Sequence, residues 1–143
     1  MKQRLTISVV IVTLNRAHLL RDALASLLQQ TRPPDEVVVV DNGSTDTTGE
    51  VIAEFSSSLN LVSVEEPRRG IPYARNTGVG HASKDIVAFI DDDCVASPDW
   101  LHFLEMPFVQ DPGVGVVGGE VSYLQGSGNV LDQFHARCMP HQD

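Results

Sequence analysis

Three consecutive aspartates, Asp91, Asp92 and Asp93, are the residues whose type and spacing point most directly to chemistry. They follow the apolar run 86–90, which is typical of a strand buried on both faces. Like charges about 4 Å apart repel by roughly 4 kcal/mol at an effective dielectric constant of 20, so this cluster favours a bound cation. Carboxylate oxygens suit Mg²⁺ or Mn²⁺ better than zinc. The pattern indicates a divalent-cation site, with a solvated acidic loop as the structural alternative.

Polar residues also follow two other predicted strands. Thr13 and Asn15 come at the end of the apolar run 7–13, and Asp41 follows the run 36–40. In an open parallel sheet, ligands bind outside the carboxyl ends of the strands. Three strand ends that carry polar groups on one edge therefore favour a binding site over a solvated acidic surface.

Predicted strands and helices alternate along the chain. Apolar runs predict strands at 7–13, 36–40, 61–64, 86–90 and 114–117, with a weaker strand at 120–124. Helical spacing predicts helices after Asn15 as a cap, after Thr47, from Pro72, and from Pro98 with Ser97 as its cap. This order predicts an α/β fold: a Rossmann-like, mostly parallel sheet with helices on both faces.

Composition restricts the partners of the chain. Its 143 residues fit one domain, and 10 basic against 19 acidic residues argue against nucleic acid or an anionic membrane as the main partner. Cys94 and Cys138 make neither a disulfide framework nor a zinc motif. Charged residues interrupt the N-terminal region that loosely resembles a secretion signal, and no run approaches about 20 apolar residues. We therefore expect a cytoplasmic location.

The usual glycine-rich phosphate loops are missing. No such loop follows the first strand, and Gly78 and Gly80 lie in or after a predicted helix. A diphosphate could still bind through a cation that bridges it to the carboxylates. Arg68, Arg69 and Arg75 offer further positive charge, and we favour Arg75 because it lies in the helix that leads into the acidic strand.

Four motifs, in order, resemble the signatures of family 2 glycosyltransferases. They are VVIVTLNR at 9–16, VVDNGSTD at 39–46, ARNTG at 74–78 and FIDDD at 89–93. The resemblance extends over about residues 7–121. It implies a GT-A fold whose Rossmann-like part holds a nucleoside-diphosphate sugar, usually with Mn²⁺ or Mg²⁺.

The resemblance also implies roles for single residues in nucleotide binding. Asp41 matches the aspartate at the nucleotide base, and Thr13 and Asn15 would line the same pocket. Arg75 matches the family's arginine near the nucleotide.

The acidic triplet matches the family's D-x-D motif. Asp91 would lie toward the ribose and Asp93 toward the metal and the diphosphate, with both as metal ligands and Asp92 in the nucleotide-binding set. Leu14 stands where the family often has an aromatic residue, and Asn42 where a second aspartate is frequent. These two departures leave the base identity open.

The length of the chain departs further from the family. Inverting members place their general base well downstream of D-x-D, whereas only 50 residues follow Asp93 here. Glu120 and Asp132 are the nearest remaining acids, but neither lies in a motif, so the catalytic residue is unassigned. We therefore expect residues 1–143 to be a single nucleotide-diphospho-sugar-binding domain, apparently truncated, with the acceptor half largely absent.

The preferred interpretation is a donor domain for inverting transfer of a sugar to an acceptor hydroxyl. The donor would be a UDP-, GDP- or dTDP-linked sugar, and the acceptor a saccharide or a lipid-linked molecule that brings the protein to a membrane. A catalytically incomplete nucleotide-binding module is the alternative. A receiver-like phosphorylation domain is disfavoured, because its acids follow strands one and three rather than two and four. An unfinished sheet edge leaves a homo-oligomer open.

Overall fold

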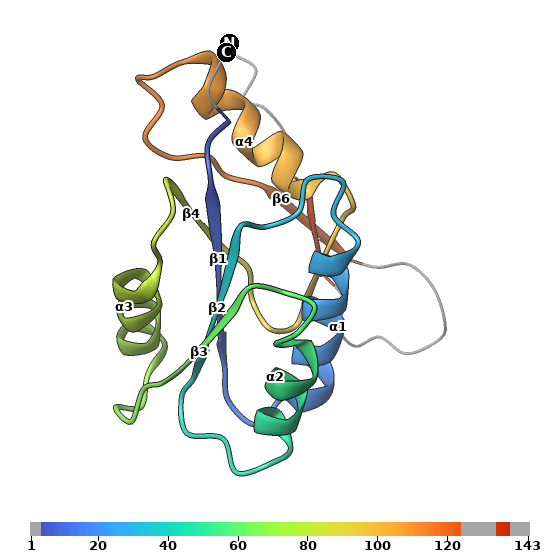
Figure 1. Cartoon of the computed structure of the whole chain (residues 1–143), viewed down its shortest axis with the longest axis vertical. Helices are drawn as coiled ribbons and strands as arrows, with labels where there is room; N and C mark the ends of the chain where they lie inside the picture. Colours follow the sequence, from blue (N-terminus) through green and yellow to red (C-terminus); the bar gives the residue numbers. More distant parts are fainter. Residues whose placement is uncertain (1–3, 124–133, 138–143) are drawn as a thin grey trace.

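A four-stranded parallel sheet forms the centre of the molecule (Figure 1). The computed structural model describes residues 4–123 and 134–137. The strands are Ile7–Thr13 (β1), Glu36–Asp41 (β2), Leu61–Glu65 (β3) and Ile86–Phe89 (β4), in the order β3-β2-β1-β4. β1 and β2 are buried almost throughout and rich in β-branched residues, as central parallel strands require.

Helices cover both faces of this sheet, as the sequence predicted. Helices Ala17–Leu28 (α1) and Thr48–Phe55 (α2) lie on one face, and Ile71–His81 (α3) lies on the other (Figure 1). Alternate residues of the central strands divide between two cores, because successive side chains of a strand point to opposite faces. Val9 and Ile11 pack with the α1 side, and Val10 packs with α3.

Close packing between α3 and the sheet depends on Gly78. A Cβ atom at this position would clash with the side chain of Val10 and would lie 3.2 Å from Cγ2 of Val40. The absence of a side chain therefore lets α3 approach β1 and β2. This approach brings the first turns of α3, which carry Arg75, to the carboxyl edge of the sheet.

A second, three-stranded sheet follows the acidic triplet. It contains Cys94–Ala96 (β5), Glu120–Tyr123 (β6) and Phe134–Arg137 (β7) in the order β5-β7-β6, with β5 parallel and β6 antiparallel to β7. Helix Trp100–Gln110 (α4) connects β5 to the segment before β6. The three aspartates thus lie in a short turn between a strand of one sheet and a strand of the other.

Two predictions for the chain after the acidic triplet are wrong. The segment 114–117 forms no strand, and Val116 is 89% exposed. The three valines of this segment find no partner strand among the described residues. Helix α4 begins at Trp100 with Asp99 as its N-cap, instead of at Pro98 with Ser97 as its cap.

The predicted strand 120–124 corresponds to β6. Leu124, Asp132 and Cys138 lie outside the described residues. Within the described ranges, no helix has the length and apolar character needed to cross a membrane.

Candidate functional site

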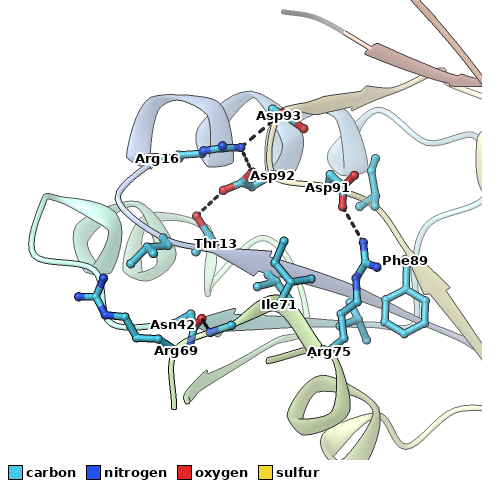
Figure 2. Close-up of a pocket in the computed structure, with 15 residues that line it drawn as sticks. Thr13, Arg16, Asn42, Arg69, Ile71, Arg75, Phe89, Asp91, Asp92 and Asp93 are labelled. Atoms are coloured by element: carbon cyan, nitrogen blue, oxygen red, sulfur yellow. Dashed lines mark hydrogen bonds and ion pairs between the residues drawn. The ribbon is translucent and has the colours of Figure 1, made fainter. Parts of the chain in front are cut away.

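A cavity of about 390 Å³ opens at the carboxyl edge of the parallel sheet (Figure 2). It lies between the ends of β1 and β4 and the start of α3, where open α/β sheets bind their ligands. Its volume is within the range of small-molecule sites. Its charged lining residues are Arg16, Arg69, Arg75, Asp91, Asp92 and Asp93. The formal charges of these three arginines and three aspartates cancel.

The three aspartates point in different directions (Figure 2). Asp91 is exposed, and its Oδ1 accepts a hydrogen bond from Nη2 of Arg75 at 3.2 Å. Asp92 is buried and accepts hydrogen bonds from Oγ1 of Thr13 at 2.8 Å and from Nη1 of Arg16 at 3.2 Å. Asp93 is partly exposed, and its Oδ2 lies 3.4 Å from the same Nη1. All three line the cavity, but the middle carboxylate is buried and bonded by the protein, whereas the outer two are more exposed.

Asp92 ties the acidic turn to the end of β1. Burial raises the pKa of Asp92, while the hydrogen bonds from Thr13 and Arg16 favour its charged form and oppose that shift. Thr13 and Asp92 are 79 positions apart in the sequence, so their bond joins the first strand to the turn after the fourth. The carboxylate thus fixes the position of the turn that carries Asp91 and Asp93.

The outer carboxylates fit a hard divalent cation. Asp91, Asp93 and Cys94 each offer one ligand atom, and these atoms lie within 4.8 Å of one another. Oxygen ligands of this kind suit Mg²⁺ and Mn²⁺. Burial, and then the charges of Asp93 and Asp91, raise the pKa of the Cys94 thiol to about 11, so it is neutral at pH 7. Soft sulfur suits Mg²⁺ and Mn²⁺ poorly, which disfavours Cys94 as a ligand. Metal binding by Asp91 and Asp93 stays a prediction.

Two other predicted site residues organise loops instead of lining the cavity. Asn15 has a positive φ of 53°, and its Oδ1 accepts hydrogen bonds from the backbone N–H groups of Thr45 and Asp46 at 2.7 and 3.3 Å. Oδ1 of Asp41 accepts from the N–H of Ser44 at 2.8 Å. These bonds fold the loop after β2 against the loop after β1. A nucleotide contact by Asn15 or Asp41 stays a prediction.

The start of α1 also differs from the prediction. Arg16, not Asn15, occupies the N-cap position. The N–H of Ala17 instead donates to Oδ2 of Asp46 at 3.1 Å, which places a carboxylate at the positive end of the helix dipole. The loop after β2 thus fixes the helix start, and with it the backbone from which Arg16 reaches the acidic turn.

Asn42 holds the loop that leads into α3. Its Nδ2 donates to the carbonyl oxygens of Glu66 and Arg68 at 2.7 and 2.8 Å, and its Oδ1 accepts from the N–H of Gly70 at 3.0 Å. An ionised aspartate has no N–H to donate, so the amide is required for this arrangement. The departure from the family pattern at position 42 therefore has a structural role, because this loop brings Arg69 to the cavity.

Glu66 anchors the same loop. It is buried and accepts hydrogen bonds from Nε and Nη2 of Arg68, both at 2.9 Å, and from Oγ1 of Thr77. These bonds, chiefly those from Arg68 and Thr77, lower the pKa of Glu66 to about 2. Arg68 also lies 4.8 Å from the centroid of the Tyr73 ring. Of the three arginines considered from the sequence, Arg68 is therefore part of the scaffold, whereas Arg69 and Arg75 line the cavity.

Sequence reasoning missed several residues of the cavity, among them Arg16, Ile71 and Phe89. Arg16 directly follows Asn15, so the strand-end argument that selected Thr13 and Asn15 could have found it. Ile71 and Phe89 carried no such signal, because large apolar residues at these positions predict burial. In the structure both are exposed, and the Arg75 guanidinium lies 5.9 Å from the centroid of the Phe89 ring.

Comparison with known proteins identifies the class. The family model for glycosyl transferase family 2 matches residues 8–135, so the chain belongs to this family. Glycosyltransferase AglE of Haloferax volcanii is 37% identical over 126 residues, which make up 85% of this chain and 41% of that protein. The motif-based resemblance is thereby confirmed.

Two solved structures share the fold. The mannosyltransferase PcManGT from Pyrobaculum calidifontis, in complex with GDP-Man and Mn²⁺, is 34% identical with a TM-score of 0.70, and the match covers 82% of this chain and 36% of that one. The glucosyl-3-phosphoglycerate synthase from Mycobacterium tuberculosis, in complex with Mn²⁺, UDP and glucosyl-3-phosphoglycerate, is 30% identical with a TM-score of 0.62, with coverages of 77% and 42%. The fold is thus of the GT-A type. The chain spans less than half the length of these relatives.

Proposed function

We propose that this chain binds a nucleoside-diphosphate sugar in the cavity at the carboxyl edge of the sheet, together with Mn²⁺ or Mg²⁺. The whole protein would transfer the sugar, with inversion, to a hydroxyl of a saccharide or lipid-linked acceptor. The observation that carries the proposal is the pair of outer carboxylates, Asp91 and Asp93, at the rim of a neutral cavity of about 390 Å³. Similar proteins solved with Mn²⁺ and GDP-Man, or with Mn²⁺ and UDP, support it.

Asp91 and Asp93 would hold the cation. When bound, the cation would stabilise the negative charge that develops on the departing diphosphate. Asp92 would stay bound to Thr13 and keep the acidic turn in place. Cys94, a neutral buried thiol, would not be a ligand.

Other residues would bind and orient the nucleotide. Arg75 is half exposed and contacts Asp91 through one nitrogen, which leaves N–H groups for a phosphate oxygen. The side chain of Arg69 makes no hydrogen bond or ion pair with the described residues, and it lines the cavity. Exposed Ile71 and Phe89 offer apolar surface to the base or the sugar.

Titration calorimetry with UDP, GDP and dTDP, each with and without Mn²⁺, tests the binding proposal. Binding should require Mn²⁺ and should be lost in Asp93→Ala. Asp22→Ala is a matched control, because Asp22 lies exposed on α1 away from the cavity. Equal binding by Asp93→Ala and the control would contradict the metal-dependent site.

A catalytically incomplete nucleotide-binding module is the second candidate, favoured by the lack of an assigned general base. Among the remaining acids, Glu120 lies exposed at the start of β6 and does not line the cavity. Incubation of the chain with UDP- and GDP-sugars separates the two candidates. Release of the nucleoside diphosphate, lost in Asp93→Ala, supports an enzyme, whereas binding without turnover supports a module.

A further inference from the structure

Arg16 has an arrangement that the proposed binding of metal and nucleotide does not explain. Its side chain lines the cavity and is about half exposed, and a single nitrogen, Nη1, contacts both Asp92 and Asp93. Nε and Nη2 make no hydrogen bond with the described residues. The guanidinium therefore neutralises two carboxylates while most of its donors remain available.

The contact with Asp93 is the weaker of the two. Nη1 lies 3.2 Å from Oδ1 of Asp92 and 3.4 Å from Oδ2 of Asp93. Asp92 is buried and is also bound by Thr13, whereas Asp93 is partly exposed at the rim of the cavity. Loss of the Asp93 contact would therefore leave Arg16 attached to the protein through Asp92.

A cation on Asp93 would compete with this guanidinium. Two positive charges near one carboxylate repel each other, so a divalent ion would bind at Asp93 more favourably once Arg16 has moved away. A guanidinium that gives up one of its two carboxylates can take a new anionic partner, and its planar set of donors matches the oxygens of a phosphate group.

We propose that Arg16 is an exchangeable counter-ion: it occupies Asp93 when no metal is bound, releases this carboxylate to a divalent cation, and then binds the phosphates of the nucleotide. Arg16 is a nucleotide-binding residue in this scheme, and the inference rests on the proposed function. Metal and nucleotide consequently bind with positive coupling, and each raises the affinity for the other by the same factor.

Titration of the apo chain with Mn²⁺ alone, followed by electron paramagnetic resonance of the free ion, tests the competition. Arg16→Ala should bind Mn²⁺ about three- to tenfold more tightly than the wild type, because a competing charge is removed. Arg16→Lys keeps the charge and should stay near the wild type. Arg21→Ala, in the helix that begins after Arg16 and paired with Glu54, is the matched control and should change nothing.

The coupling is measured by calorimetry with UDP and GDP at zero and saturating Mn²⁺. The factor by which Mn²⁺ tightens nucleotide binding should be several-fold smaller in Arg16→Ala than in the wild type. Circular dichroism of each variant shows whether the fold is intact. A merely structural role of Arg16 would lower or leave unchanged the Mn²⁺ affinity, and either result overturns the inference.

Asp93→Ala separates failure of this inference from failure of the proposed function. If the wild type binds Mn²⁺, Asp93→Ala does not, and Arg16→Ala binds no more tightly, only the counter-ion role is wrong. If neither the wild type nor Arg16→Ala binds Mn²⁺, the metal site is wrong, and the inference is wrong with it.

Discussion

At the amino edge of the central sheet, Arg32 is 8% exposed and donates to the carbonyl oxygens of Leu5 and Pro33 at 2.6 Å and to Glu105 at 2.8 Å. At the carboxyl edge, Arg16 and Arg75 are 52% and 49% exposed, and each contacts carboxylates through one nitrogen at 3.2 Å or more. Arginine and carboxylate groups thus form a buried, fully bonded network at the amino edge, which we call closed. At the carboxyl edge they form an exposed network with unused N–H donors, which we call open. A closed network suits a scaffold, and an open network suits exchange with a ligand.

Removal of Arg32, the arginine of the closed network, should have the largest effect on stability. Arg32→Ala should lower the free energy of unfolding by about 3–5 kcal/mol, because it leaves the largely buried carboxylate of Glu105 without its ion-pair partner. Urea denaturation followed by the fluorescence of Trp100, the single tryptophan, measures this. A loss no larger than that of Arg21→Ala would show that the amino edge is not a closed network.

Replacement of Asn42 tests whether hydrogen bonds at the carboxyl edge also stabilise the fold. Asn42→Ala should cost about 1–3 kcal/mol, since two carbonyl groups and one N–H lose their partner. Nucleotide affinity should fall as well, because the loop that carries Arg69 loses its support. Asn60→Ala, which removes one exposed hydrogen bond to the Asp35 carbonyl, is the matched control for urea denaturation. Equal stability of the two variants would refute the role of Asn42.

The pH dependence of stability tests the contribution of Glu66, which anchors the same loop as Asn42. Its pKa is about 2 in the folded protein and 4.5 in the unfolded reference, so the bonded carboxylate contributes its full stability above pH 4.5. That contribution is lost as the pH falls from 4.5 toward 2. Urea denaturation across this range should show a shallower decline for Glu66→Gln than for the wild type. Parallel curves would mean that the loop does not depend on the charge of Glu66.

Removal of Arg75, which belongs to the open network, should have the smallest effect on stability. Arg75→Ala should change the free energy of unfolding by less than about 1 kcal/mol, because exposed ion pairs contribute little. The same variant should bind UDP or GDP more weakly in the presence of Mn²⁺. A stability loss as large as that of Arg32→Ala would remove the contrast between the two edges.

The sequence predicted the central sheet well because its signals are local. The apolar runs correspond to β1 to β4, and the periodic segments between them correspond to α1 to α3. The second sheet was not predicted as a unit. β5 has three residues, and its partner β7 begins 38 positions after β5 ends, so neither strand has a pattern that identifies the other.

For the candidate site, the sequence predicted where the residues lie but not where their side chains point. The strand-end rule placed Thr13 and the acidic triplet at one edge, and Arg75 was chosen from the helix that leads into the acidic strand; all of them line one cavity. It did not separate Asp92, which turns into the protein, from its two neighbours. It also did not show that Asn15 and Asp41 bind the backbone of neighbouring loops. Side-chain direction depends on partners distant in the chain, which no local pattern contains.

The bond between Thr13 and Asp92 has a consequence for folding. Its two residues are 79 positions apart, so this contact closes a long loop of chain and pays the corresponding entropy. An intermediate that contains only the first half of the molecule lacks the acidic turn altogether. Any ligand selective for the assembled cavity would therefore stabilise the completed fold by mass action and leave such intermediates unaffected.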